Sequence, residues 1–217
     1  MSGFDGEQLR NDIREKLRPV FADAMARESE NGIYAFFLRT VDTGEIVTAV
    51  CNTTANLREQ CILDEGEEFP SREDDEFAYS DYCAQRWGDA EWEEEIIDYA
   101  EGTFRLDEPL ARFYEQFPDD HFGGAAYAAM ILAMRDLDGE GVLGEGELRD
   151  AITLFCGSSD GDPEWLFIES AQRLNSPEIA QRFAEEWRVA TGIGAKAPHK
   201  PSGAQYLTFL QWIEGED

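Results

Sequence analysis

The stretch from Asp136 to Glu147 (DLDGEGVLGEGE) has oxygen-bearing side chains at the spacing of a calcium-binding loop. Carboxylates occupy its first, third, fifth and last positions, and Gly141 stands where such a loop turns sharply. An EF-hand loop leads into a helix, whereas here the β-branched run AITLFC follows shortly, and the sequence shows no partner hand. Two interpretations stand: a divalent-metal site around Asp136, Asp138 and Glu147, or an acidic turn that joins a helix to a strand. The second is favoured, and no metal ligand is assigned.

A second motif, Gly157 to Gly161 (GSSDG), matches the Gly-x-Ser-x-Gly pattern of a serine nucleophile. It lies between a predicted strand and a predicted helix, the context that this motif requires, and it would make Ser159 the nucleophile. A histidine base is missing, because His121 precedes the serine and His199 lies in a proline-containing segment. Too few strands precede the motif to build a hydrolase sheet, and Gly, Ser and Asp are common turn residues. We therefore assign no catalytic residue.

The third motif is a pair of tryptophans, Trp87 and Trp92, set among carboxylates in RWGDAEWEEE. Tryptophan contributes large contact areas at protein interfaces, and the carboxylates would attract a cationic surface. Trp92 also shares a predicted helical stripe with Ile96, which favours burial of both rings in the core, so both roles stay open. The candidate partner-binding residues are Trp87, Asp89, Glu91, Trp92, Glu94 and Glu95.

The net charge limits the partners that this chain can bind. It has 217 residues, with 47 Asp and Glu against 18 Lys and Arg, and a formal net charge of −29. Nucleic-acid phosphates and anionic lipid headgroups repel such a chain, which argues against nucleic acid and membrane as partners. The charge is concentrated between Glu59 and Glu101, where 17 acids face only Arg72 and Arg86. This excess predicts a basic protein as partner, and a generally acidic surface adapted to the host is the alternative.

The composition is that of a folded protein. Hydrophobic residues make up 42% of the chain and aromatic residues 12%, which is enough apolar surface to build a core. The N-terminal segment is polar and lacks the apolar stretch of a secretory signal, and no apolar run approaches the about 20 residues that span a bilayer. Four scattered cysteines and two histidines indicate neither a disulfide framework nor a zinc site. These features predict a cytoplasmic protein without a cofactor.

The spacing of apolar residues predicts the elements that position these motifs. Helical spacing predicts an N-terminal amphipathic helix, kinked or divided at Pro19. The continuous apolar run Ile33–Val41 predicts a strand buried on both faces, and Glu45–Asn52 returns as the second strand of a hairpin. A short helix is expected after Thr53. At Phe77–Trp87 we predict a strand, although the aromatic spacing fits a helical turn almost as well.

The second half of the chain is predicted to be mainly helical. The expected elements are helices at Asp89–Ala100, Leu106–Phe117 and Phe122–Leu137, a buried strand at Ala151–Cys156, and helices that start at Asp162 and Ser176. This order predicts an α/β (α+β) domain in which a small mixed sheet, built on the N-terminal hairpin and the later strand, is covered by several helices. We place this single domain at residues 1–191. Residues 192–217 are predicted to be a linker and a short apolar C-terminal element that docks on the domain.

In these motifs and their order the sequence resembles the bacterial domain of unknown function 4303 family (DUF4303). The resemblance covers most of Met1 to Trp187. It rests on the segments IYAFFLRTVDTGEIVTAVCNT, RWGDAEWEEE, AAMILAMRDLDGEGVLGEGELR, AITLFCGSSD and SAQRLNSPEIAQRF. It implies a small bacterial cytosolic domain in which the acidic turn is a structural connector. No activity is assigned to the family, so the resemblance implies no catalytic residues; by analogy it suggests a role like that of immunity and accessory proteins of toxin systems.

We therefore predict a non-enzymatic, immunity- or inhibitor-like protein whose acidic face captures a basic protein. Electrostatic steering would bring the two together, and Trp and carboxylate groups of this face, which is centred between Glu59 and Glu101, would then occlude the cationic cleft of the partner. The alternative is a carboxylate-based protein or enzyme that binds a small ligand or a divalent metal. A structural module within a larger assembly is a third interpretation.

Overall fold

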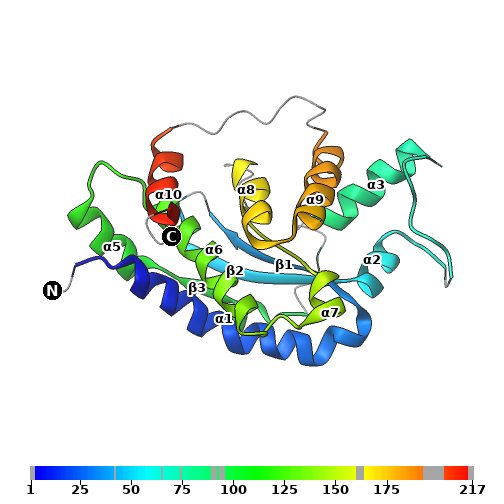
Figure 1. Ribbon diagram of the computed structural model, residues 1–217, viewed down its shortest axis with the longest axis horizontal. Helices are drawn as coiled ribbons and strands as arrows, with labels where there is room; N and C mark the ends of the chain where they lie inside the picture. The colour runs from blue at the N-terminus through cyan, green and yellow to red at the C-terminus, as the bar shows by residue number, and fades with distance from the viewer. Residues whose placement is uncertain are drawn as a thin grey trace.

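The predicted hairpin forms the centre of the structure. The computed structural model describes residues 3–41, 43–64, 66–73, 75–88, 92, 96–159, 164–192 and 203–214. Within them one mixed sheet has the strand order β3-β2-β1-β4 (Figure 1). The strands are β1 (Ile33–Thr40), β2 (Ile46–Thr53), β3 (Thr103–Arg105) and β4 (Thr153–Ser158). β1 pairs antiparallel with β2 and parallel with β4, so the fold is α+β with a mixed sheet, as predicted.

Helices cover both faces of this sheet. The helices are α1 (Gly6–Glu28), the 3-10 turn η1 (Ser29–Asn31), α2 (Thr54–Gln60), α3 (Glu76–Trp87), α4 (Tyr99–Gly102), α5 (Asp107–Gln116), α6 (Phe122–Gly139), α7 (Gly146–Asp150), α8 (Glu164–Leu174), α9 (Pro177–Ala190) and α10 (Ala204–Glu214). In Figure 1, α1 lies below the sheet, whereas α8 and α9 lie above it. None of the described helices is both long and apolar enough to cross a membrane.

Alternate residues of the strands face two different hydrophobic cores. On one face Phe36 and Leu38 of β1 pack with α1 and α6. On the other face Phe37 and Phe155 stack on each other, with ring centroids 4.6 Å apart, and pack with α3, α8 and α9. Because successive side chains of a strand point to opposite faces, a strand between two cores must be apolar at nearly every position. This confirms the prediction made from the continuous apolar run.

α1 is the amphipathic helix that the apolar spacing predicts. Asp5 caps it, because its carboxylate accepts hydrogen bonds from the backbone N–H groups of Glu7 and Gln8 at 3.0 and 3.3 Å. The predicted division at Pro19 is wrong, since the helix is continuous. Pro19 and Glu15 are both exposed, so water can bond the carbonyl oxygen that the proline leaves free. The buried face that holds the helix on α6 comprises Leu9, Ile13, Leu17, Phe21 and Ala24.

The turn of the hairpin packs closely on the start of α6. Gly44 has a φ of +75°, a left-handed conformation that glycine adopts without strain. A Cβ at this position would lie 2.8 Å from the Cβ of Ala126 and 2.9 Å from the Cα of Gly123. Both the left-handed backbone and the lack of room for a side chain therefore require glycine here. The close contact at Gly44 holds the hairpin turn against α6.

Two predicted elements differ from the structure. The segment Phe77–Trp87 lies in the helix α3 and is not a strand. Asp75 caps this helix, and its buried face, which includes Tyr82 and Trp87, packs in the second hydrophobic core. The helix predicted from Asp89 falls largely outside the described residues, and its described residues 92 and 96–98 are not helical. The helix there begins only at Tyr99, after the cap Asp98.

Two short elements were not predicted at all. β3 has three residues and exists through its pairing with β2, where Phe104 lies opposite Val47. α7 has five residues and occupies the connection between the acidic turn and β4. Neither is long enough to show a hydrophobic period, so their sequence pattern could not reveal them.

The outer edge of β4 is closed by side chains of α8 and of the turn that follows it. The Ser170 hydroxyl accepts a hydrogen bond from the backbone N–H of Cys156 at 2.8 Å and lies 3.1 Å from its carbonyl oxygen. The side-chain amide of Asn175 bonds the backbone of Leu154: its Oδ1 accepts a hydrogen bond from the N–H at 2.9 Å, and its Nδ2 donates one to the carbonyl oxygen at 2.7 Å. These side chains take the place of a further strand, so the edge offers no free backbone groups for pairing with another chain at these two positions.

α10 returns to the body of the protein and packs on α6. A Cβ at Gly124 would lie 2.4 Å from the carbonyl oxygen of Gln205 and 2.8 Å from the backbone nitrogen of Phe209, so the two helix backbones touch here. Phe209 is fully buried. At the far end of α10 the ring of Trp212 packs edge-on against that of Phe4, with centroids 5.2 Å apart. The apolar side chains of this C-terminal segment thus pack against the body of the protein.

We predict that Ser170→Ala destabilises the protein by roughly 1–3 kcal/mol, because it leaves the buried N–H of Cys156 without an acceptor. Urea denaturation, followed by circular dichroism, measures the change as a lower midpoint at an unchanged m-value. Gln181→Ala is the control, since it removes only an exposed hydrogen bond within α9 and should cost at most about 0.5 kcal/mol. Equal midpoints for the two variants would contradict the role given to Ser170.

Candidate partner-binding surface

The segment that joins α2 to α3 projects at one end of the molecule, at the right of Figure 1, and it is rich in exposed carboxylates. We call residues 59–81, which run from the end of α2 into α3, the acidic arm. Its exposed carboxylates are Glu59, Asp64, Glu67, Glu68, Glu73, Asp75, Glu76 and Asp81. Among the described residues these carboxylates form a single ion pair, in which Arg72 lies 4.0 Å from Glu76. The arm is therefore a surface of largely uncompensated negative charge.

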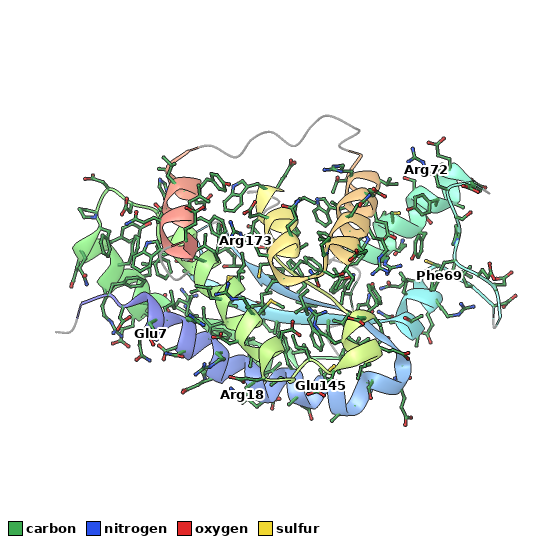
Figure 2. All side chains as sticks on the ribbon, viewed as in Figure 1. Glu7, Arg18, Phe69, Arg72, Glu145 and Arg173 are labelled. Carbon is green, nitrogen blue, oxygen red and sulfur yellow. The ribbon has the colours of Figure 1, made fainter. Side chains whose placement is uncertain are left out.

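Phe69 holds the middle of the acidic arm to the body. Phe69, labelled in Figure 2, packs against Tyr82 of α3 with ring centroids 5.1 Å apart. The guanidinium of Arg58, at the end of α2, lies over the same ring at 5.5 Å and also donates a hydrogen bond to the carbonyl oxygen of Asp64 at 2.5 Å. The connection between α2 and α3 is thus tied down at its middle, and its carboxylates are presented from a positioned backbone.

The tryptophan pair lies inside the protein. Trp87 is 1% exposed and Trp92 is 4% exposed, and both pack in the core that contains Phe155. Of the two roles that the sequence leaves open, this placement favours the structural one, because neither ring offers contact area to a partner. The other candidate residues, Asp89, Glu91, Glu94 and Glu95, lie outside the described residues.

Beside Trp87 the structure holds an ion pair that the sequence analysis missed. Glu186 of α9 accepts a hydrogen bond from the indole N–H of Trp87 at 2.7 Å and lies 3.3 Å from Nε of Arg86. The side chains of Arg86 and Glu186 are only 14% and 9% exposed. The guanidinium also lies 5.1 Å from the ring centroid of Tyr34, whose hydroxyl donates to the backbone carbonyl of Arg86 at 2.9 Å. This centre joins α3, α9 and β1, three elements distant in the sequence.

Burial and charge set the pKa values in this centre. Burial is the largest single effect on Arg86 and lowers its pKa, but the charge of Glu186 together with the neighbouring Tyr82 and Tyr34 outweighs burial, and the pKa is raised. Burial raises the pKa of Tyr34, against the opposing effect of Arg86, and it raises the pKa of Tyr79 to about 12. Burial also raises the pKa of Cys83 to about 11. The raised pKa values keep these phenols and this thiol protonated near neutral pH, so Arg86 and Glu186 are the charged groups of the centre.

We predict that Glu186→Ala destabilises the protein by about 3–5 kcal/mol, because it leaves the Arg86 guanidinium buried without its carboxylate. The double variant Arg86→Met with Glu186→Gln should recover most of this loss, since it removes both charges and keeps an acceptor for the indole N–H of Trp87. Chemical denaturation of the three proteins measures both effects. A double variant as unstable as Glu186→Ala would show that the charge imbalance is not the cause.

The acidic turn after α6 is held by arginines. Asp136 accepts two hydrogen bonds from Arg10 of α1, from Nε at 2.7 Å and from Nη2 at 2.6 Å. Glu140 pairs with Arg18, the last of three arginines spaced four residues apart along α1 and labelled in Figure 2. Among the described residues, no group of three or more His, Cys, Asp or Glu side chains is arranged to hold a metal ion. This geometry favours the interpretation as a structural turn.

Asp138 of the same turn is bound by Arg149 of α7. This guanidinium also donates hydrogen bonds to the carbonyl oxygens of Ile152 at 2.8 Å and Leu174 at 2.9 Å. Arg149 therefore joins the turn to the start of β4 and to the end of α8. Glu147, the last ligand of the calcium pattern, is exposed.

We predict that Asp136→Asn lowers the free energy of unfolding at pH 7 by roughly 1–2 kcal/mol, because Arg10 loses its charged acceptor. The hydrogen bonds from Arg10 lower the pKa of Asp136 below its ordinary value of 3.8. Ionised Asp136 thus stabilises the fold above pH 3.8, and this contribution is lost as the pH falls through the lowered pKa.

The difference between the wild type and Asp136→Asn should therefore disappear in acid, which denaturation curves across this pH range will measure. Asp150→Asn, at an exposed position of α7, is the control and should change stability little at neutral pH. A stability difference that persists unchanged in acid would contradict the ionic role of Asp136.

The serine motif is part of the sheet edge. Ser159 directly follows β4, and its backbone N–H donates to the carbonyl oxygen of Thr40 at 2.8 Å. His121 precedes α6, whereas His199 and the end of the motif, Asp160 and Gly161, lie outside the described residues. The described residues thus show a backbone role for this segment.

A groove of about 380 Å³ lies between the end of α1 and the start of α2. Its lining includes Arg27, Glu28 and Asn31 from the first side and Asn56 and Glu59 from the second. The sequence analysis missed this groove because its two sides are separated in the sequence by the whole hairpin. Glu59 is both a wall of the groove and the first residue of the acidic arm.

These features define a class of protein: an α+β domain with helices on both faces of a mixed sheet and with an acidic surface whose described carboxylates are largely uncompensated. The chain belongs to the family described as a domain of unknown function (DUF4303), whose model matches residues 13–176. The match contains β1, β2, β4 and the acidic arm, and it confirms the resemblance found in the sequence. No curated protein and no solved structure matches the chain.

Proposed function

We propose that this protein is a binding protein whose acidic surface captures a basic protein. The observation that carries the proposal is the contrast between two sets of carboxylates. Asp136, Asp138 and Glu186 are each paired with an arginine, whereas the carboxylates of the acidic arm are exposed and, Glu76 excepted, unpaired among the described residues. Carboxylates that stabilise the fold are compensated, so the uncompensated ones are available to a cationic partner.

The mechanism we propose is electrostatic steering followed by contact. Clustered like charge raises the local concentration of a cationic partner and its association rate by about 10- to 1,000-fold. The partner we propose is a basic domain with a cationic cleft, such as a toxin domain that acts on nucleic acid. The acidic arm would then cover this cleft, in the manner of an immunity protein or inhibitor in the cytoplasm. The buried tryptophans have no part in this contact.

The alternative, a carboxylate site for a small ligand or divalent metal, has less support. It depends on Asp136, Asp138 and Glu147, and the first two are occupied by Arg10 and Arg149. The third interpretation, a structural module, would leave the apolar C-terminal segment exposed, whereas Phe209 and Ile213 are buried.

We predict that the association rate with the partner falls steeply with salt, and that Glu67→Gln with Glu68→Gln and Glu73→Gln slows it by about tenfold at low salt. The partner is first identified by affinity co-purification from the host lysate, and stopped-flow fluorescence then measures the rate. The matched control neutralises three exposed acids elsewhere, Glu15, Glu115 and Glu178. Equal rates for the two triple variants, or a rate independent of salt, would contradict the proposal.

A further inference from the structure

We infer that α2 and the groove beside it form the docking point of the acidic surface, and that they receive an amphipathic, lysine- or arginine-bearing segment of the partner. A cationic side chain of that segment enters the groove at Glu28 and Glu59, and an apolar side chain packs on Ile62. The inference rests on the proposed function and deepens it, because it names the place and the chemistry of the contact.

The groove has a net negative lining. Arg27 is compensated by Asp23, with Nε of the guanidinium 2.8 Å from the carboxylate, and Nη2 donates to the carbonyl oxygen of Ile96 at 2.6 Å. Glu28 accepts a hydrogen bond from Asn31 at 2.8 Å, and its closest described cation is the same Arg27, at 3.9 Å. Glu59 pairs with no cation among the described residues. The carboxylates on the two sides therefore remain able to bind a cation.

Ile62 ends α2 at a position where glycine is the usual residue. The backbone N–H of Ile62 bonds the carbonyl of Glu59 at 3.0 Å, and the N–H of Leu63 bonds that of Arg58 at 3.0 Å. This pair of bonds is the Schellman motif, in which the residue after the C-cap adopts a left-handed conformation. Ile62 does so with a φ of +54°, although a β-branched side chain is strained there.

The side chain of Ile62 gains no compensating burial. It is 90% exposed, the highest value among the large apolar residues exposed in the described part of the chain. The strained backbone destabilises the folded protein relative to glycine at this position, and the exposed side chain contributes almost no burial to offset the strain. Ile62 stands three residues beyond Glu59, so an apolar contact point and a cation-binding carboxylate are adjacent at the end of one helix.

Charge and apolar contact together select the occupant. The exposed face of α2 carries Ala55 and Glu59 one turn apart, and the carboxylates of the arm continue beyond Ile62. A purely polar basic chain would leave Ile62 in water, whereas a segment with alternating basic and apolar faces satisfies both contacts.

The test uses two labelled synthetic peptides of equal length and lysine content, measured by fluorescence anisotropy with the full chain at low salt. One peptide has leucines on one face of an amphipathic helix, and the other has serines in their place. We expect the wild type to bind the leucine peptide at least about tenfold more tightly. Ile62→Gly should abolish most of this preference without lowering the Tm, because glycine relieves the strain.

Glu59→Gln should weaken the binding of both peptides by more than Glu115→Gln, which removes an equal charge from the exposed face of α5. Leu207→Ala is the matched control for Ile62→Gly, since Leu207 is an exposed apolar residue of α10, and it should keep the leucine preference. The inference is overturned if Ile62→Gly keeps that preference or if Glu59→Gln and Glu115→Gln bind alike.

The same experiment separates the two proposals. Equal, salt-sensitive binding of both peptides to the wild type would overturn the docking point at Ile62 and leave electrostatic capture standing. Failure of both peptides to bind at low salt would overturn the electrostatic capture itself, and the docking point with it.

Discussion

The strand β1 has no face and no edge in contact with water along most of its length, and the rest of the fold follows from this constraint. Its edges pair with β2 and β4, and its faces require two separate helical layers. One layer is α1 with α6, and the other is α3 with α8 and α9. Because β4 is in turn an outer strand, α8 and the turn after it must close its edge, which Ser170 and Asn175 do.

The distribution of charge follows from the same packing. A carboxylate that is partly removed from water needs a cation or hydrogen-bond donors, and the chain has only 18 basic residues for 47 acidic ones. Arginines pair with the poorly exposed carboxylates of Asp136 and Glu186. The exposed carboxylates of the acidic arm need no cation for folding, because water solvates them. A strongly negative surface is therefore compatible with a stable core.

The described part of the acidic arm is in contact with the body of the protein. Phe69 ties its middle to Tyr82 and Arg58, and α3, into which the arm runs, is anchored beyond it through the hydrogen bond from Trp87 to Glu186. A surface that is already positioned loses less conformational entropy when a partner binds. This supports the protein-binding role that we propose, with the contact at α2, where the groove and the exposed side chain of Ile62 adjoin the acids.

The sequence by itself determined the elements with a long and clear period. The hairpin, α1, α5, α6, α8 and α9 follow from apolar spacing, from caps such as Ser176 and from the turn at Gly44, because these signals are local. The excess of charge between Glu59 and Glu101 is equally a property of the sequence. Phe77–Trp87 could not be assigned correctly, since its aromatic spacing fits two periods and only packing against α9 selects the helix.

Tertiary structure alone decided which residues are available for function. Whether Trp87 is an anchor or part of the core depends on Glu186, which lies 99 residues away. Whether Asp136 binds a metal or an arginine depends on Arg10, 126 residues away. The groove and the exposure of Ile62 likewise arise from the meeting of α1 and α2 and from a left-handed backbone that no apolar pattern encodes. Such contacts join distant segments, and their free energy is set by burial and geometry that a linear pattern does not contain.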